Sequence, residues 1–463
     1  MRDRGSRWPC CIIVTVALTL SALHGCASVD SPARAGRTAS PATSLTLSRD
    51  DDALLEDLSK RSFMFFWEQA DPDTGLVRDR ARTTGVPVDG VSRDIASIAS
   101  VGFGLAGLCV ANARGWVPPG AVTARARATL RFLADRMPHE RGWFYHFVNL
   151  HTGAREWSSE VSSIDTALLL AGVLTVGQCL QDDEVSGLAA RIYQRVDFRW
   201  MLAGDARLLS HGWKPETGFL PSRWDRYSEL MVLYVLAIGS PAHGVPPESW
   251  HAWQRPVIKF GGYTYVGGPA PLFVHQYSHA WVDFRGLRER QSPHIDWWQN
   301  SVDATHAHRA FCRSLSSEFP GYDDDVWGIT ASDSRLGYVA WGGPPRDGPI
   351  DGTVVPCAAA GSLMLAPEVA VPAVRTMHAR FGAAIYGRYG FADAFHPANG
   401  WVNPDVIGID VGITLLSAEN LRTGRVWRWF MANREIPPAL ERAGLTRAAA
   451  APVTLSQWLG LSR

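Results

Sequence analysis

Hydrophobic residues return at helical spacing along most of the chain from about residue 51 onward. Apolar positions three and four residues apart form one face of a helix, whereas a helix that is apolar on nearly all sides must be buried. Residues 98–113 and 167–176 are of the second kind. The pattern predicts about a dozen helices, which cover residues 52–69, 92–113, 121–136, 162–180, 185–199, 225–238, 247–256, 298–316, 357–364, 367–380, 406–418 and 424–432.

Buried helices alternate with half-exposed ones in this order, and the loops between them carry Gly, Pro, Trp, His and acids. Such alternation predicts an all-α fold, an (α/α)6 barrel in which helices form a closed double ring and long loops at one end carry the function. A helical solenoid would need a fixed repeat period, which the sequence lacks. Strands are expected only at residues 142–150 and in a small hairpin that includes residues 260–266.

The first residues are typical of an export signal. A basic start with Arg2, Arg4 and Arg7 precedes an apolar run, residues 12–22, that is too short to span a bilayer. The run ends in Leu-His-Gly-Cys, which resembles a lipobox, so residues 1–26 are predicted to be a lipoprotein signal peptide with Cys26 acylated. Because Ala27 follows, by analogy with bacterial sorting, an outer-membrane lipoprotein facing the periplasm or the cell surface is expected; the alternative is an ordinary cleaved secretory signal.

The rest of the chain divides by composition. Residues 27–50 are rich in Ser, Ala, Thr and Pro and predict a flexible tether, residues 51–434 form the predicted domain, and residues 435–463 are expected to be a tail that packs on its surface. Four cysteines follow the signal, and none forms a CxxC pair. Disulfides are permitted outside the cytoplasm, but spacing assigns no partners. Cys109 and Cys179 lie in apolar helical runs typical of buried thiols.

Composition excludes several kinds of protein. The 463 residues are 46% hydrophobic and 19% charged, and 45 basic residues balance 45 acidic ones, so no basic surface for nucleic acid is expected. The chain has no GxSxG elbow, phosphate-binding P-loop or Rossmann fingerprint, and we expect no cofactor. The 19 tryptophans are unusual. Most should be buried, while some could stack on the apolar faces of sugar rings.

Two acids stand at the starts of apolar helices. Glu229 follows Tyr227 and Ser228 and precedes a long apolar run, so its charged form should be costly and its pKa raised. The alternative is an acid that the helix dipole stabilises, with Asp225 as N-cap. Glu160 lies on a loop near Trp157, a combination that suits a sugar site.

Asp165, which follows Glu160 in the chain, has a structural interpretation instead. Ser162 and Asp165 have the spacing of a capping box before an apolar helix.

A segment at residues 273–285 is dense in polar and aromatic groups. His275, His279 and Asp283 fall four residues apart, so in a helix they could share one face and bind a metal. No HExxH or CxxC motif accompanies them, and we expect no metal. Together with Trp281 and Arg285, they offer donors, acceptors and aromatic surface for saccharide hydroxyls.

Further candidates lie near the end of the predicted domain. Trp341 belongs to long loops rich in Gly and Pro, for most of which a rigid structural role is the simpler interpretation. Asp393 stands between Phe391 and Phe395, which suits substrate binding. Asp410 stands at the entrance of an apolar helix, either as an acid of the first turn or as a general base.

Seven groups of motifs follow one another along residues 55–432. They are Phe65-Phe66-Trp67-Glu68-Gln69-Ala70, Gly75-Leu76-Val77-Arg78-Asp79-Arg80, Ser97-Ile98-Ala99 with Gly102-Phe103-Gly104, Tyr145-His146-Phe147, Ser163-Ile164-Asp165-Thr166-Ala167, Tyr227-Ser228-Glu229 and Tyr389-Gly390-Phe391-Ala392-Asp393-Ala394-Phe395. In this order they resemble the glycoamylase-like proteins and are similar to glycoside hydrolase family 144, the bacterial endo-β-1,2-glucanases.

The resemblance implies an (α/α)6 barrel and hydrolysis with inversion. It places Glu160 and Glu229 in acidic motifs, with Glu229 as general acid and Glu160 as its partner, and it makes Asp393 and Asp410 candidates for the base or for substrate contacts. The motif at Asp410 is expected to read Asp-Gln-Gly, but Val411 replaces the Gln and removes a polar contact.

The sequence therefore predicts an inverting endo-β-1,2-glucanase that acts on a glucan outside the cytoplasm and is anchored through a lipid on Cys26. Two alternatives remain open. One is an exo-acting, glucoamylase-like hydrolase of α-glucans. The other is a catalytically weakened, lipid-anchored glycan-binding protein.

Overall fold

The computed structural model describes residues 47–335, 337–348 and 350–447. The predicted signal peptide with Cys26, nearly all of the tether and the end of the predicted tail lie outside the described residues. No helix in the described part is both long enough and apolar enough to cross a bilayer.

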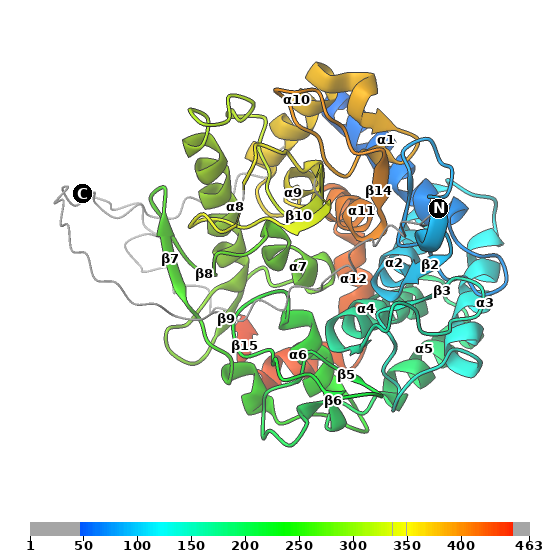
Figure 1. The fold of residues 1–463 in the computed structure, drawn as a ribbon. Helices are drawn as coiled ribbons and strands as arrows, with labels where there is room; N and C mark the ends of the chain where they lie inside the picture. Colours follow the sequence, from blue (N-terminus) through cyan, green and yellow to red (C-terminus); the bar gives the residue numbers. More distant parts are fainter. Residues whose placement is uncertain (1–46, 336, 349, 448–463) are drawn as a thin grey trace, which may run out of the picture. The chain divides into compact units, whose positions relative to one another are not determined.

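Helices dominate the described part of the chain, as the periodicity predicts (Figure 1). Most predicted helices are present, with ends that shift by a few residues. They are α1 (Arg49–Glu68), α2 (Ile98–Arg114), α3 (Ala121–Asp135), α4 (Ser163–Cys179), α5 (Asp183–Arg195), α6 (Met231–Gly239), α7 (Tyr277–Trp281), α8 (Trp297–Ser314), α9 (Pro356–Ala360), α10 (Pro367–Ile385), α11 (Gly408–Thr423), α12 (Arg425–Met431) and α13 (Ile436–Arg442).

Strands are more numerous than expected, but each has only two to four residues. They pair antiparallel into small sheets, and the predicted hairpin is confirmed as β7 with β8. The strands are β1 (Arg80–Arg82), β2 (Ile95–Ser97), β3 (Phe147–Asn149), β4 (Val161–Ser162), β5 (Gly212–Lys214), β6 (Gly218–Phe219), β7 (Val257–Phe260), β8 (Tyr263–Val266), β9 (Leu287–Glu289), β10 (Ala331–Ser334), β11 (Gly337–Ala340), β12 (Tyr386–Gly387), β13 (Gly390–Phe391), β14 (Asp405–Ile407) and β15 (Leu445–Arg447).

Two predicted helices are wrong in part. The helix expected over residues 92–113 begins only at Ile98, because residues 95–97 pair with β3 as strand β2. The helix expected over residues 247–256 is a short 3-10 helix, Pro247–His251. The prediction at residues 435–463 included no helix, yet α13 forms there and packs on α6.

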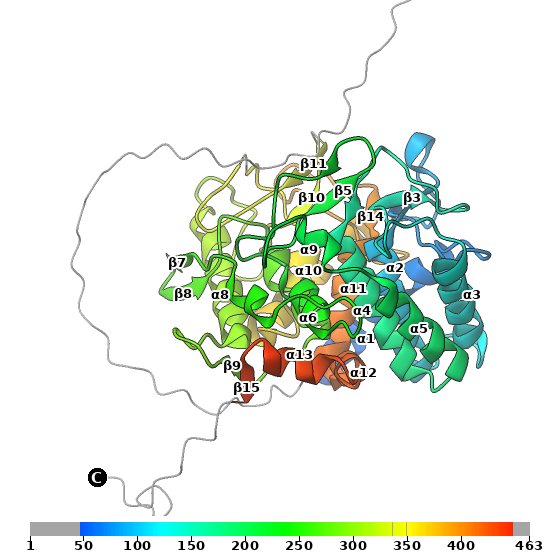
Figure 2. The same cartoon turned by 90° about the horizontal axis from the view of Figure 1, so that it is seen from below.

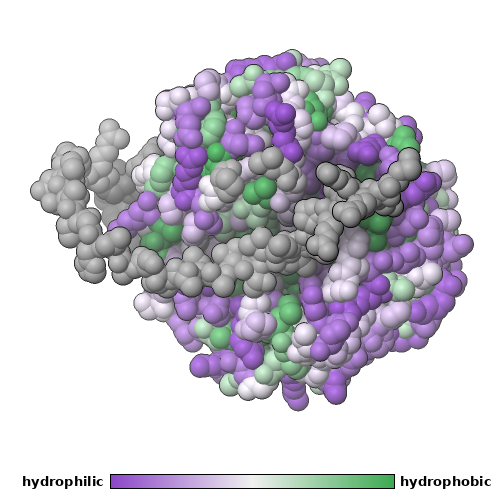
Figure 3. Space-filling view, in the orientation of Figure 1, coloured by the Kyte–Doolittle hydropathy of each residue, from purple (hydrophilic) through white to green (hydrophobic). Residues whose placement is uncertain are grey.

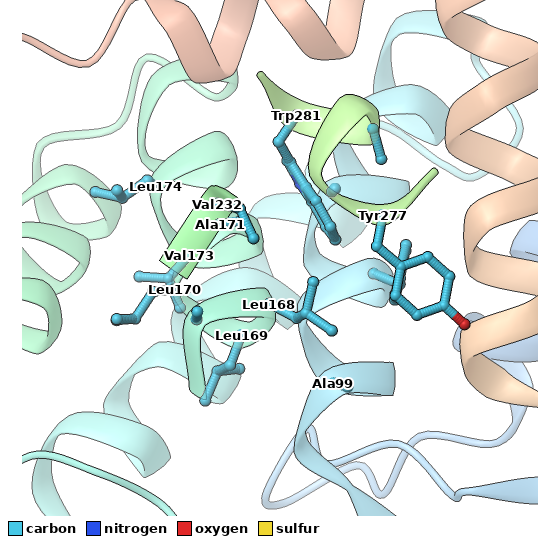
Figure 4. Close-up of a cluster of buried hydrophobic side chains, with 14 of the residues drawn as sticks. Ala99, Leu168, Leu169, Leu170, Ala171, Val173, Leu174, Val232, Tyr277 and Trp281 are labelled. Atoms are coloured by element: carbon cyan, nitrogen blue, oxygen red, sulfur yellow. The ribbon is translucent and has the colours of Figure 1, made fainter. Parts of the chain in front are cut away.

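Six helices are nearly all buried: α2, α4, α6, α7, α9 and α11. Contacts run from α2 to α4, α6, α7 and α11 and back to α2. Close packing of α2 on α4 depends on glycine, since a Cβ on Gly102 would lie 2.3 Å from the carbonyl oxygen of Leu168, and one on Gly172 would lie 2.0 Å from that of Gly102. Figure 4 shows the apolar side chains that α2, α4, α6 and α7 contribute to this core.

The other long helices, α1, α3, α5, α8 and α10, bury one face and expose the other. Buried and half-exposed helices thus alternate along the chain, and the exterior seen in Figure 3 is mostly hydrophilic. The alternation that the hydrophobic pattern predicts is therefore present in the fold.

A disulfide joins Cys109 of α2 to Cys179 at the end of α4. The interpretation of these two residues as buried thiols is therefore wrong: both helices are apolar, but they bring the two sulfur atoms together. Cys312 and Cys357 are buried free thiols.

Strands gather at one end of the helices. In Figure 2, β3, β5, β10, β11 and β14 lie along the upper edge, whereas β9, β15, α12 and α13 lie at the lower edge. Strands β2, β4 and β14 lead directly into α2, α4 and α11, so the N-terminal ends of these buried helices lie at the strand-bearing end. The acidic residues that the sequence places at helix starts are thereby brought to the same end of the domain.

Candidate active site

Glu229 lies in the turn that precedes α6. The predicted helix 225–238 starts six residues late, at Met231, so Asp225 is not its N-cap. A serine of α7 fixes this turn: the Oγ of Ser278 donates to the carbonyl oxygen of Glu229 (2.7 Å) and accepts from the amide of Val232 (3.0 Å). The backbone that carries the carboxylate is thus held by a neighbouring buried helix.

The Glu229 carboxyl group has an apolar setting. Burial raises its pKa to about 7, and the negative charge of Asp165 acts in the same direction. Within the described part of the chain, no Lys, Arg or His side chain forms an ion pair with it. Near neutral pH a large share of Glu229 is therefore protonated, as the sequence analysis expects, and it can donate a proton.

Glu160 has the opposite setting. Its Oε1 lies 3.1 Å from Nδ1 of His146, and although burial opposes ionisation, His146 lowers the pKa of Glu160 to about 2. Burial also disfavours the charged imidazole, but Asp165 and Glu160 together raise the pKa of His146 to about 9. At neutral pH, His146 is therefore a cation between two carboxylates.

Asp165 fulfils its predicted structural role and contributes to this cluster as well. Ser162 caps α4, because its Oγ accepts from the amide of Asp165 (3.2 Å) and donates to Oδ2 of the same residue (2.5 Å). Oδ2 of Asp165 also lies 3.5 Å from Nε2 of His146. Ser162 is confirmed as the N-cap, but the reciprocal bond of a capping box is not formed, because the Ser162 amide donates to the carbonyl oxygen of Phe144 (3.0 Å).

Asp410 and Asp393 form a buried pair of acids. Asp410 is in the first turn of α11, and its carboxyl group contacts that of Asp393, which lies between β13 and β14. Oδ2 of Asp393 accepts from the amide of Asp333 and from Nδ2 of Asn403, both at 2.9 Å. Burial raises the pKa of both Asp393 and Asp410.

The β10–β11 hairpin is fastened over this pair. Asp333 of β10 accepts from Nη1 of Arg80 (2.8 Å), whose Nε donates to Asp79 (3.0 Å). Tyr338 stands opposite Asp333 in the hairpin, and its side chain is 55% exposed. Local burial of the hydroxyl and then the charges of Asp410 and Asp393 raise the pKa of Tyr338.

The predicted catalytic acids share charged neighbours, which shows that they belong to one site. The charge of Asp165 acts on both Glu229 and His146, and that of Asp79 acts on both His146 and Asp410. Burial first, and then Asp410 and Glu229 among its neighbours, raise the pKa of Tyr277. The three predicted catalytic acids, Glu229, Glu160 and Asp410, therefore lie around one centre.

Trp157 is placed as a substrate platform would be. Its side chain is 47% exposed, and its backbone, like that of Ser158, has a positive φ (53° and 50°) that side-chain-bearing residues rarely adopt. Its ring packs on Phe147 at 5.0 Å, and the Phe147 ring stacks on His146 at 3.9 Å. A strained loop thus presents an indole beside the His146 cluster.

The structure places three other candidates in the core. His275 bonds the hydroxyl of Tyr227 (2.9 Å) and His279 bonds Ser301 (2.8 Å), while Trp281 is fully buried. Burial lowers the pKa of each histidine to about 3, so both are neutral. Their predicted contact with substrate conflicts with this burial.

The shared helical face that the alternative of a metal site would need is not formed. Helix α7 spans only Tyr277–Trp281, so His275, His279 and Asp283 do not share one helix. No group of three or more His, Cys, Asp or Glu residues in the described ranges has an arrangement that could hold a metal ion.

Asp283 and Arg285 lie away from the acids. Arg285 forms a two-pronged ion pair with Asp283, both contacts at 2.7 Å, and its guanidinium lies 4.0 Å from the ring centre of Trp427 in α12. Because α12 is at the end opposite to the site strands (Figure 2), these two residues are unsuited to substrate binding at this site.

The remaining aromatic candidates are also buried. Trp341 donates its indole N–H to Ser332 (3.2 Å), Phe391 borders a small cavity, and Phe395 is in the second hydrophobic core. Val411, which replaces the expected Gln, borders the same cavity. Their burial conflicts with a stacking role in substrate binding.

The sequence analysis assigned no role to several residues of the site: Asp79, Arg80, His146, Tyr277, Asp333, Tyr338, Cys357 and Asn403. His146, Asp79 and Arg80 do lie in the motifs that carry the family resemblance. For Tyr277, Asp333 and Asn403 the signal is three-dimensional, since they reach the acids only through folding.

Known proteins resemble this chain in sequence and in fold. The family described as "Glycoamylase: Putative glucoamylase" matches residues 221–434, the part that includes Glu229, Asp393 and Asp410. The fold matches an endo-β-1,2-glucanase from Chitinophaga pinensis, solved in complex with sophorotriose and glucose, with 27% identity, a TM-score of 0.79, and coverage of 87% of this chain and 99% of the other. Over residues 221–434 the chain is similar to the glycoamylase-like proteins.

Two more relatives extend this result. A glucoamylase-like structure from Bacteroides uniformis, described as putative, has 28% identity, a TM-score of 0.79, and coverage of 87% and 99% of the two chains. An exo-β-1,2-glucooligosaccharide sophorohydrolase from Parabacteroides distasonis is 25% identical over 433 residues, which is 85% of this chain. The chain spans 58% of the length of that sophorohydrolase.

Proposed function

We propose that this glycoamylase-like protein is a glycoside hydrolase that cleaves β-1,2-linked glucose polymers with inversion of configuration. The observation that carries the proposal is the spread of pKa values at one centre: burial raises the pKa of Glu229 to about 7 and that of Asp410 to about 6, whereas His146 lowers the pKa of Glu160 to about 2. An inverting glycosidase needs one neutral and one ionised carboxyl group. The substrates named for two relatives support β-1,2-glucan as the substrate.

In this mechanism Glu229 protonates the glycosidic oxygen as the bond to the anomeric carbon breaks. Asp410 removes a proton from the attacking water, directly or through a substrate hydroxyl, on the opposite face of the sugar. Glu160 stays ionised beside His146, so it cannot be the proton donor; the proposal gives it the role of orienting His146 and the sugar next to Trp157. Each of the acids at the buried helix starts thus has its own role.

The architecture supports an (α/α)6 toroid. The buried helices contact one another in sequence from α2 through α4, α6, α7 and α11 back to α2, and half-exposed helices alternate with them along the chain. The described residues between α6 and α7 form no long half-exposed helix. In the proposed toroid, two short helices take the place of one on the outside of α6: the 3-10 helix Pro247–His251 and α13, which packs on α6.

Action outside the cytoplasm is part of the proposal. The Cys109–Cys179 disulfide supports it, because disulfides persist in oxidising compartments. The predicted lipid anchor at Cys26 would hold the protein at the membrane, and mass spectrometry of the protein extracted with detergent tests for the acyl group.

The test of function is product analysis with purified protein and separate β-1,2-glucan, starch, β-1,3-glucan and β-1,4-glucan. Short oligosaccharides from β-1,2-glucan alone are expected, with the anomer of the new end, read by NMR at early times, opposite to the bond cleaved. Sophorose as the sole product would assign exo action, as named for the Parabacteroides relative. Glucose from starch, or binding without products, would refute the proposal.

A further inference from the structure

Asp393 does not behave as a ligand for substrate, although its motif suggests one. It is 3% exposed, and its carboxyl group contacts that of Asp410. Oδ2 accepts two hydrogen bonds, from the Asp333 amide and from Asn403, whereas the buried Oδ1 receives a hydrogen bond from no described residue. The Asp410 carboxyl group is therefore the neighbour with which Oδ1 of Asp393 could share a hydrogen bond.

The charges around Asp393 and Asp410 limit how many protons the two carboxyl groups can lose. Among the described residues, the ionisable groups that face the pair come from α7, α9, β10, β11 and β1 with the residue before it. Arg80 is the one cation in this set, and it is already paired with Asp79 and Asp333. Two adjacent buried carboxylates repel each other, so one of them must hold a proton. The facing groups are Asp79, Arg80, Tyr277, Asp333, Tyr338 and Cys357.

The hydrogen-bond pattern indicates which of the two holds it. A neutral carboxylic acid has one oxygen that accepts and one that donates. Asp393 fits this description, because its Oδ2 already accepts twice, its Oδ1 receives no hydrogen bond from a described residue, and its carboxyl group contacts that of Asp410. Asp410 fits the anion, since the Cys357 thiol is also in hydrogen-bond contact with it.

We propose that Asp393 is a permanently neutral acid whose Oδ1 proton is donated to the Asp410 carboxylate, which makes Asp393 a positioning residue for the catalytic base. The proposal rests on the proposed function, in which Asp410 is that base. During hydrolysis, Asp410 accepts one proton from water and Glu229 gives one to the leaving sugar. Asp393 keeps its own proton, and the cycle closes when Asp410 loses and Glu229 regains a proton from solvent.

A pair of substitutions tests this role. In Asp393→Asn the amide oxygen can accept from Asp333 and Asn403 while the amide N–H donates to Asp410, so the turnover number is expected within about fivefold of the wild type. Asp393→Ala removes the donor, so the acidic limb of the kcat/KM profile should move to higher pH by about one unit, with turnover reduced about 100-fold. An Asn variant as impaired as the Ala variant would show that Asp393 acts as an anion and would overturn the proposal.

A second readout needs no substrate. Infrared spectra at neutral pH report protonated carboxyl groups, and the Glu229→Gln background removes the Glu229 signal. One protonated-carboxyl band is expected in that variant, and the Glu229→Gln/Asp393→Asn double variant should lose it. Persistence of the band in the double variant, or its absence from the single variant, would overturn the assignment even in an active enzyme. If the band is present but the wild type is inactive on every glucan, the proposed function is refuted while the assignment of the proton to Asp393 stands.

Discussion

Glu229 and Glu160 have similar surroundings in sequence but opposite states in the structure. Each precedes a buried apolar helix, α6 or α4, at the strand-bearing end of the domain. Burial acts on both, yet the pKa of Glu229 is raised to about 7 and that of Glu160 is lowered to about 2. The difference is His146, which pairs with Glu160, while Glu229 has no ion-pair partner among the described residues.

This comparison shows that a position at the start of an apolar helix does not by itself determine whether an acid is protonated. Whether the pKa of the acid is raised or lowered depends on a charged partner that is itself held in place. His146 can fill this role because Asp165, which the N-cap Ser162 holds in the first turn of α4, lies 3.5 Å from its other ring nitrogen.

The largest expected effect separates the two acids directly. Glu229→Gln removes the proton donor, and general acid catalysis contributes roughly 10²–10⁴-fold, so turnover of β-1,2-glucan should fall by about 1,000-fold. Glu160→Gln should reduce it by only about 10- to 100-fold, since the variant disturbs His146 rather than the donor. Initial rates of both variants, with circular dichroism as a check on folding, measure the contrast. Equal losses would contradict the division of roles.

A substitution of His146 should make Glu160 resemble Glu229. In His146→Gln the cation is lost, so burial is no longer offset and the pKa of Glu160 should rise above its ordinary value. We expect turnover to fall by about 100-fold, accompanied by a new ionisation in the pH–rate profile between pH 4 and 7. An unchanged profile would show that His146 does not control Glu160.

Trp157 offers a smaller effect, on binding. Trp157→Ala removes the exposed indole beside the His146 cluster, so KM should rise about tenfold while the turnover number changes little. Val257→Ala is the matched control, because Val257 is 61% exposed on strand β7. Steady-state kinetics on β-1,2-glucan oligosaccharides measure both. A loss in turnover with unchanged KM would place Trp157 in the chemical step instead.

The smallest effect is on stability, and its sign differs between the acids. The raised pKa of Glu229 means that the wild type loses stability as pH rises from about 4.5 to about 7, so Glu229→Gln should melt about 2 °C higher than the wild type above pH 7. The lowered pKa of Glu160 contributes stability above about pH 4.5 that is lost as pH falls toward 2.

Glu160→Gln should therefore melt lower than the wild type at neutral pH. Calorimetry at several pH values tests both signs. Equal pH dependence of the two variants would contradict the assigned shifts.

Hydrophobic periodicity predicts most helices and the alternation of buried with half-exposed ones, because it reports which face of a helix meets the core. It fails where residues form strand pairs instead, as at residues 95–97, which pair with β3. It also misses α7, whose five residues are too few to show a period.

The site was predictable in its acids and in Trp157. Glu229, Glu160 and Asp410 have sequence signals, namely acids beside apolar helices, and they come together in the structure. Their protonation states depend on residues distant in sequence, so no local pattern gives them. The polar segment at residues 273–285 misleads for a related reason: His279 and Trp281 are buried in the core, where Nε2 of His279 bonds the hydroxyl of Ser301.

The central claim is that Glu229, unlike Glu160, holds a proton near neutral pH. Carbon-13 NMR of protein labelled at the glutamate side-chain carboxyl carbons tests this directly, with Glu229→Gln and Glu160→Gln used to assign signals. The account predicts one resonance that titrates with a midpoint near pH 7 and disappears in Glu229→Gln, while the Glu160 resonance shows an ionised carboxylate down to about pH 2. A Glu229 midpoint at or below the ordinary value of about 4.5 would contradict it.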